Sequence, residues 1–474
     1  MRRRINIWAN IDWLTVVMYL LLVFMGWVNI YAAVYNEEHH SIFDFSMRYG
    51  KQLVWISAAI LIAIAVFIVD INFYSYFAYA IYGLMIFLLI IVLFFGIEVH
   101  GAQSWFQIGG IRIQPTEFAK IATALVIARY LSSYNVQINT FKSYWRLAAI
   151  ILIPSILTFL QNDTGSALVY FVFFLVLFRE GISAEIILLG FFMIVLFILT
   201  LILEKLSIIL LSIAVAFIIF SFVNRKLKNI GIALFVLVMA SIITYGVNKI
   251  LNLQLTYFYL IFIALGASAI VYVILAIRYK VRNVFIFLIF LFASIIFALS
   301  IDYVFDNFLA EHQQKRINVV LGLESDPYGV EYNVNQSKIA IGSGGLSGKG
   351  FLRGTQTKYD FVPEQSTDFI FCTIGEEWGF LGTFTIVTLF VIFLLRLIFI
   401  AERQRSAFSR IYGYGVISIL FFHVAVNIGM TIGLVPVIGI PLPFFSYGGS
   451  SLWAFTILVF ILLRLDASRL ELLR

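Results

Sequence analysis

Charged residues are scarce in this chain, and their scarcity excludes a soluble protein. Asp, Glu, Lys and Arg make up 12% of its 474 residues, whereas about a quarter is usual for soluble proteins. Hydrophobic residues make up 62%, and apolar runs of roughly 20 residues, enough to cross a bilayer as a helix, recur from end to end. We therefore expect an all-α polytopic membrane protein in which residues 1–474 form a single integral membrane domain.

Cysteine is also nearly absent, so no disulfide can form within the chain. The single Cys372 lies in an apolar run, which favours a packing role over a reactive thiol. The net charge is +7, but in a membrane protein Lys and Arg mostly mark cytoplasmic loops. The composition therefore predicts the lipid bilayer as a partner and no nucleic acid.

Hydropathy predicts about 14 membrane spans. They are expected near 13–34, 52–70, 74–96, 116–131, 145–160, 165–178, 183–203, 207–222, 229–248, 256–276, 284–303, 370–400, 411–433 and 445–466. Basic clusters fall on alternate connections, as the positive-inside rule requires, although the connection near Asp70 has none. This pattern predicts a multi-pass protein with both termini in the cytoplasm and the 309–368 loop outside.

One long polar interval, from about Leu309 to Gly382, interrupts the apolar pattern. A loop of this length between spans is where chemistry is expected. Its segment GSGGLSGKG is not a phosphate-binding loop, because Gly350 follows Lys349 where Ser or Thr is required. The glycines instead indicate a tightly packed loop. Its lysines and arginine suit an anionic headgroup, and Glu364 and Asp368 are the carboxylates at its end.

Shorter polar breaks occur elsewhere, and most allow two interpretations. The loop 35–52 contains two histidines beside two glutamates, but their spacing is not a metal-ligand pattern, and a solvated loop is favoured. Lys51, at the start of the second span, is equally compatible with a snorkelling lysine and with a functional one. Asp163, in QNDTGSAL, is either a functional residue at membrane depth or a helix cap.

The segment 101–122 contains Pro115, which suits the first turn of a helix. Glu117 and Lys120 are three residues apart and share a helix face, as a local ion pair or as a polar cavity wall. Prolines and glycines also break the helix pattern in 427–451, which is tolerated at depth only in a buried or cavity-lining position. Four polar breaks lie on the outer side, namely 101–122, 161–168, the long polar interval and 427–451. They predict one outward-facing cavity for an amphiphilic, anionic substrate, and they leave open whether the protein carries out a reaction on this substrate or transports it.

Six motifs resemble the SEDS family (shape, elongation, division and sporulation proteins), and within it the rod-shape-determining members. The motifs are GAQSWF…IQPTEFAKIA (101–122), QNDTGSAL (161–168), DPYG…QSKIAIGSGGLSGKGF..GTQ (326–356), PEQSTDFIF..IGEEWGFLG (363–382), VNIGM (426–430) and PVIGIPLPFFSYGGSS (436–451). The resemblance implies a SEDS-type bundle of about ten core spans. The core would comprise 13–203 and 304–466, with about four extra helices inserted at 204–303 and an extracytoplasmic catalytic loop at 304–369.

The resemblance implies a peptidoglycan glycosyltransferase, a hexosyltransferase that polymerises lipid II at the outer face of the bacterial cytoplasmic membrane for cell elongation and shape. It places the family's essential aspartate at Asp368, as general base. The further substrate-binding candidates are Lys51, Arg112, Gln114, Glu117, Lys120, Asp163, Lys338, Arg353, Gln356, Glu364 and Ser450. Implied partners are a class B penicillin-binding protein, which is a transpeptidase, other elongation-complex membrane proteins, and the undecaprenyl-diphosphate-linked substrate. No cofactor is obligatory; a divalent cation is compatible with a diphosphate, but no clear ligand set is visible.

Two residues depart from the family pattern. Ser104 stands where many members have a basic residue before the tryptophan, so that charge must come from elsewhere, and Arg112 is the candidate. Ser366 replaces the histidine that is common two residues before the aspartate, so no histidine assists Asp368 there. A lipid II flippase or other transporter and a non-catalytic scaffold of the wall-synthesis complex are the alternatives. Polar breaks confined to the outer side weigh against the first, and the second leaves Asp368 without a role.

Overall fold

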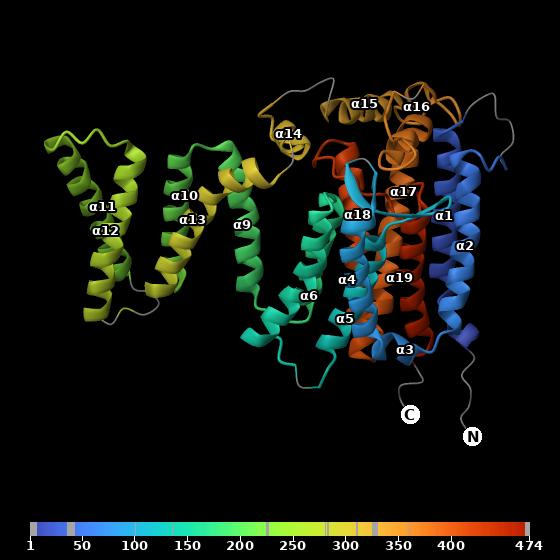
Figure 1. The fold of residues 1–474 in the computed structure, drawn as a ribbon, viewed down its shortest axis with the longest axis horizontal. Helices are drawn as coiled ribbons and strands as arrows, with labels where there is room; N and C mark the ends of the chain where they lie inside the picture. The colour runs from blue at the N-terminus through green and yellow to red at the C-terminus, as the bar shows by residue number, and fades with distance from the viewer. Residues whose placement is uncertain are drawn as a thin grey trace. The chain divides into compact units, whose positions relative to one another are not determined.

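The chain folds into helices that form two compact units (Figure 1). The computed structural model describes residues 7–35, 43–99, 101–134, 136–223, 227–279, 281, 284–309, 311–324, 330–359 and 361–469. The first unit comprises Met1–Ala184 and Ser325–Arg474, and the second comprises Glu185–Glu324. The predicted extra helices at 204–303 lie within the second unit, which begins and ends outside those bounds.

Within the described residues, 12 helices are long and apolar enough to cross a membrane. Those of the first unit are α1 (Trp13–Ala33), α2 (Arg48–Ile68), α4 (Ala78–Phe95), α6 (Phe141–Leu160), α17 (Ile370–Glu402), α18 (Ala407–Thr431) and α19 (Gly449–Ala467). The all-α membrane fold is therefore confirmed. Two predicted spans are shorter helices: 116–131 is α5 (Pro115–Leu131), with 17 residues, and 165–178 is divided between α7 (Thr164–Val169) and α8 (Phe173–Arg179). The exact number of spans stays a prediction.

A cluster of charged side chains joins three helix ends at one end of the first unit. Asp12 caps α1 and accepts hydrogen bonds from Arg396 Nη2, in α17, at 2.6 Å and from Arg403 Nη2, just after α17, at 2.9 Å. Arg403 also pairs with Asp466 near the end of α19. Burial raises the pKa of Asp12, but hydrogen bonds from Arg396 and Thr15 outweigh burial and lower the pKa to about 2. The start of α1 and the end of α19 therefore lie at the same end of the bundle.

A small three-stranded antiparallel sheet joins α4 to α5, and the sequence analysis did not predict it. It runs in the order β1 (Ile97–Val99), β2 (Ala102–Ile108), β3 (Ile111–Ile113). The expectation that Pro115 lies in the first turn of a helix was correct, since α5 begins with it. β1 and β3 have three residues each, and the seven residues of β2, AQSWFQI, do not alternate between apolar and polar, so period-two alternation does not stand out in the sequence. The backbone N–H of Gln103 donates to Gln161 O at 3.0 Å, which ties the sheet to the QNDTGSAL turn.

The polar interval from 309 to 382 is more helical than the predicted loop. In the first unit it forms α15 (Val330–Ser343), α16 (Thr355–Lys358) and the start of α17, while the DPYG motif lies outside the described residues. Figure 1 shows α15 lying across the end of the bundle. Ser337 Oγ, on α15, donates to Thr431 O at the end of α18 at 2.9 Å. The described residues of this interval that belong to the first unit, 330–359 and 361–382, therefore include a packed cap on the bundle, formed by α15, α16 and the start of α17.

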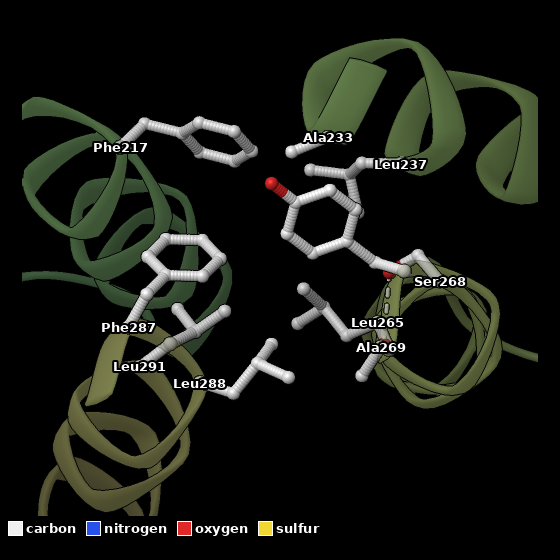
Figure 2. A pocket seen from close by; sticks show the side chains of 10 residues that line it. Phe217, Ala233, Leu237, Leu265, Ser268, Ala269, Phe287, Leu288 and Leu291 are labelled. Carbon is white, nitrogen blue, oxygen red and sulfur yellow. Dashed lines mark hydrogen bonds between the residues drawn. The ribbon is translucent and has the colours of Figure 1, made fainter. Parts of the chain in front are cut away.

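The second unit has its own apolar core. Its helices are α9 (Ala184–Ile202), α10 (Lys205–Val223), α11 (Leu227–Ile250), α12 (Tyr257–Arg278), α13 (Val284–Phe308) and α14 (Glu311–Val320). Aromatic rings join α10 to α13, where the centroids of Phe220 and Phe287 lie 4.7 Å apart. Figure 2 shows the apolar side chains around a cavity of ≈ 20 Å³ in this core, which is about the space of one water molecule.

Candidate active site

Asp368 lies just before the first turn of α17, and α18 holds its backbone. The buried amide of Asn427 donates to Asp368 O at 2.8 Å and to Ile440 O at 2.7 Å. Gly439 lies against the carboxylate, since a Cβ atom at this position would be 3.5 Å from Asp368 Oδ2. The half-buried aspartate is therefore bordered by α18 and by the irregular segment that precedes α19.

This irregular segment, residues 436–448, joins two of the sequence motifs in space. On one side, Ser446 Oγ donates to Thr367 O at 2.6 Å, and the backbone N–H of Tyr447 donates to Ser366 O at 2.8 Å. On the other side, Gly165 packs so closely that a Cβ there would lie 2.0 Å from Ile438 O. The segment therefore packs between the Asp368 turn and the QNDTGSAL turn and contacts both of them. Only glycine fits at position 165 without a shift of the backbone.

A buried ion pair lies between α5 and α18. Lys120 Nζ is 2.8 Å from Glu117 Oε2, and the two side chains are 1% and 3% exposed. His423 of α18, which sequence reasoning missed, places Nε2 3.1 Å from Lys120 Nζ. The local ion pair is thus present, and α18 provides a third member. An ionisable residue inside a predicted span was the available signal for His423.

Asp163 is the helix cap that one of the two interpretations predicted, and it also bonds to a second motif. Its Oδ1 accepts from the backbone N–H of Ser166 at 3.0 Å at the start of α7. Its Oδ2 accepts from Gln114 Nε2 at 2.7 Å, just before α5. Burial raises the pKa of Asp163, and the hydrogen bonds from Ser166 oppose that rise. The start of α5 and the start of α7 are therefore held together.

Arg48 lies in the stretch 35–52, for which the sequence favours a solvated loop, and is a second residue that sequence reasoning missed. It begins α2, and its Nη1 donates to Ser366 Oγ at 2.6 Å and lies 3.7 Å from Glu364 Oε2. Its guanidinium carbon is 5.9 Å from the centroid of the Tyr447 ring. A cation therefore contacts the position where the family's histidine is replaced by Ser366, two residues from Asp368.

Other predicted site residues lie on the surface or serve the packing. The side chains of Lys51, Arg112, Lys338 and Arg353 are exposed and form no hydrogen bond or ion pair with any residue that the structure describes. Lys338 lies over Gly433, where a Cβ would be 2.7 Å from its Nζ. Ser450 is buried in the first turn of α19.

Glu376, also missed, organises the glycine-rich stretch of the cap. Its fully buried carboxylate accepts from Lys349 Nζ at 2.7 Å and from the backbone N–H groups of Thr355, Gln356 and Thr357 at 2.7, 2.9 and 2.9 Å. These three residues form the first turn of α16, whose N–H groups have no partner within the helix. Gln356 therefore contacts the protein through its backbone at this carboxylate.

The glycine-rich stretch is inserted into a break in α17. At Gly379 the backbone is non-helical, with φ 62° and ψ −158°. The backbone N–H groups of Phe380 and Leu381 donate to Gly345 O at 2.9 Å and Leu346 O at 3.1 Å instead of to α17 itself. In return, Glu376 O accepts from the backbone N–H of Lys349 at 3.0 Å. The first part of α17, which follows Asp368, is thus bonded to the cap.

The described part of the chain contains no group of three or more His, Cys, Asp or Glu residues that would hold a metal ion. The pair of histidines in the 35–52 loop lies outside the described residues. A divalent cation therefore stays a prediction from the resemblance.

Fold and site together define an integral membrane protein that places charged residues and a helix-initial aspartate at one end of a helical bundle. The model of the FtsW, RodA and SpoVE family, described as cell cycle protein, matches residues 12–211 and 265–471. The chain belongs to this family, and the resemblance to SEDS proteins is confirmed.

Relatives of known name cover most of the chain. Peptidoglycan glycosyltransferase RodA of Treponema pallidum (strain Nichols) is 32% identical over 98% of this chain and 99% of its own length. Peptidoglycan glycosyltransferase MrdB of Escherichia coli (strain K12) is 32% identical over 78% of this chain and 72% of its own.

Solved structures show the same fold. A chain from a study of the coordination of polymerization and crosslinking by a peptidoglycan synthase complex superposes with a TM-score of 0.63 at 23% identity, covering 97% of this chain and 98% of the other. The rod shape determining protein RodA of Thermus thermophilus superposes with a TM-score of 0.55 at 22% identity, covering 97% of each chain.

Proposed function

We propose that this protein is a peptidoglycan glycosyltransferase that polymerises lipid II into glycan strands at the outer face of the bacterial cytoplasmic membrane. The observation that carries the proposal is the likeness, over 98% of the chain, to a family member that bears this name. The geometry supports it, because Asp368 lies at the end of the bundle opposite the Asp12 cluster. Carboxylates and basic side chains gather at the Asp368 end.

Asp368 acts as the general base. It takes the proton from the C4 hydroxyl of the GlcNAc of one lipid II molecule, and that oxygen forms a bond to C1 of the MurNAc at the end of the growing chain. The bond from C1 to the diphosphate oxygen breaks, and undecaprenyl diphosphate leaves with the electron pair. A single displacement of this kind inverts the configuration at C1. A positioned base contributes about 10²- to 10⁴-fold to the rate.

Positive charge for the leaving diphosphate comes from the first turn of α2. Arg48 contacts Ser366, and Lys51 lies three residues further along the helix, on the same side. Their guanidinium and ammonium groups stabilise charge that develops on the diphosphate. Lys120 is less suited to this role, because Glu117 already neutralises it in a buried position. We therefore assign Lys120 to the wall of the site.

The same proposal includes orientation and partner. The Asp12 cluster brings the start of α1 and the end of α19 to one end of the bundle, which is the cytoplasmic end. The cap, formed by α15, α16 and the start of α17, is extracytoplasmic. A class B penicillin-binding protein cross-links the strands that the enzyme makes. This choice of partner is supported by the fold that the protein shares with a chain studied as part of a peptidoglycan synthase complex.

The test is polymerisation of purified lipid II by the purified protein, alone and with its transpeptidase. We expect glycan strands from the wild type and a loss of at least about 10² in rate from Asp368→Asn, which removes the base at constant shape. Asp70→Asn is the matched control, because Asp70 is an exposed aspartate that caps α3 (Ile71–Tyr76) at the other end of the bundle. Full synthesis by Asp368→Asn refutes the role of this residue. Transport of lipid II across vesicles without any polymer from the wild type supports a flippase instead.

A further inference from the structure

Two polar side chains of α18 hold two consecutive carbonyl groups of the 436–448 segment. Asn427 Nδ2 donates to Ile440 O at 2.7 Å, and His423 Nδ1 lies 3.2 Å from Pro441 O. The two residues are four apart and share a helix face, and they are 0% and 1% exposed. We infer that His423 and Asn427 are positioning residues, which set the carboxylate of Asp368 by holding the Ile440–Pro441 backbone. This inference rests on the proposed glycosyltransferase function.

Asn427 connects this backbone to the aspartate directly. Its amide donates to Asp368 O at 2.8 Å as well as to Ile440 O, so one planar group fixes the distance between the two chain segments. Gly439, next to Ile440, is the residue that lies against the Asp368 carboxylate. A shift of the Ile440 backbone therefore moves Gly439 beside the Asp368 carboxylate and, through Asn427, the backbone carbonyl of Asp368 as well.

His423 has a defined tautomer, which follows from its neighbours. Lys120 Nζ, 3.1 Å from Nε2, can only donate, so Nε2 is the acceptor. Nδ1 then carries the hydrogen, and Pro441 O accepts it. Since Glu117 Oε2 lies 2.8 Å from the same ammonium, a continuous buried row runs from α5 through His423 to the segment beside Asp368.

A role in packing α18 alone does not account for these contacts. The side-chain hydrogen bonds of Asn427 go to Asp368 and Ile440, and those of His423 go to Pro441 and Lys120, all outside α18. Burying an amide and an imidazole in a bilayer-embedded bundle is costly unless each finds partners. Here the partners are the backbone that borders Asp368 and the cation that belongs to the wall of the same site.

The first experiment measures kcat and KM for lipid II separately. His423→Leu and Asn427→Leu should each lower kcat by about 10- to 100-fold, the effect of a small misplacement of a reacting group, with KM unchanged. His423→Gln should retain most of the rate, because its amide offers both an acceptor and a donor. The double variant should lose less than the product of the single losses, since both residues hold one segment.

The same variants are compared by amide hydrogen exchange over residues 437–448. The backbone N–H groups of Tyr447 and Gly448 bond to Ser366 O at 2.8 Å and Gln52 Oε1 at 3.2 Å, and they should exchange faster in His423→Leu and Asn427→Leu. Phe421→Leu, at an exposed position of the same helix, is the control and should change neither kcat nor exchange.

Three results would overturn the inference: a wild-type kcat in both leucine variants, a His423→Gln variant as slow as His423→Leu, or unchanged exchange over 437–448. If the wild type makes no polymer, the proposed function fails. The exchange measurement then decides by itself whether the two side chains hold this segment.

Discussion

The Glu376 carboxylate makes a prediction whose size follows from its contacts. Glu376→Ala removes the acceptor for Lys349 and for the backbone N–H groups of Thr355, Gln356 and Thr357. Removing one partner of a buried ion pair costs about 3–5 kcal/mol, and each buried N–H left without a partner costs about 1–3 kcal/mol. Lys349 is 26% exposed and can turn to water, and of the three N–H groups only that of Thr357 is fully buried, because Thr355 is exposed and Gln356 half-buried. We therefore expect a net cost of about 3 kcal/mol for local opening of the cap, mostly from the Thr357 N–H and from the part of the ion-pair energy that water does not replace.

This cost is measured by amide hydrogen exchange of the purified protein in detergent or nanodiscs. A cost of about 3 kcal/mol corresponds to roughly 10²-fold faster exchange at residues 349–357. The exchange rate of Glu376→Gln should lie between those of the wild type and Glu376→Ala. The amide oxygen of glutamine can accept from the donors on one side, but its N–H group faces a donor on the other side. Slower polymerisation should accompany the loosening, since the first part of α17 follows Asp368.

Glu98→Gln is the control for the charge, because Glu98 is exposed in β1, and it should leave exchange in the cap unchanged. Wild-type exchange at 349–357 in Glu376→Ala would refute this account. It would mean that the glycine-rich stretch is held by its backbone bonds to the break in α17 without the carboxylate.

Two further predictions concern the same bundle. Gly379→Ala should lower the thermal stability and the yield of folded protein, because φ is 62° and a Cβ would lie 2.3 Å from Gly348 N. Gly83→Ala in α4 is the control and should lower neither, because nothing lies within 4 Å of the added Cβ. Equal melting temperatures for the two variants would contradict the prediction. Asp12→Asn should cost about 2 kcal/mol at pH 7, since the pKa falls from its ordinary 3.8 to about 2 on folding. A carboxyl group with a lowered pKa stabilises the fold above pH 4 and loses that stabilisation as the pH falls towards 2, so melting curves of the wild type and Asp12→Asn should converge over this window, and parallel curves would refute the assignment.

Local patterns in the sequence were enough for the class of protein and for several helix starts. Pro115 at the first turn of α5, Asp163 as a cap and Glu117 paired with Lys120 depend on residues within a few positions of each other. The same holds for the broken helix before α19, where prolines and glycines in one short stretch exclude regular structure.

Contacts across the sequence could not be predicted in this way. Lys120 meets His423 across 303 positions, and Arg48 meets Ser366 across 318. From the sequence alone, each of these side chains could equally be a cation at the membrane interface or a polar group in the core. Only the partner that the fold brings into contact distinguishes a site residue from these. Glu376 was missed for the same reason, because its partners are backbone N–H groups that carry no signal in the sequence.

The sequence by itself therefore determined a polytopic membrane protein of the SEDS family, because the length and composition of its apolar runs and six short motifs are properties of neighbouring residues. Only the tertiary structure decided which motifs meet. It placed Asp368 against Gly439 and Asn427, inserted the glycine-rich stretch into α17 and buried Lys120 between Glu117 and His423. The physical reason is that these contacts depend on how helices from distant parts of the chain pack, and packing is a property of the whole bundle.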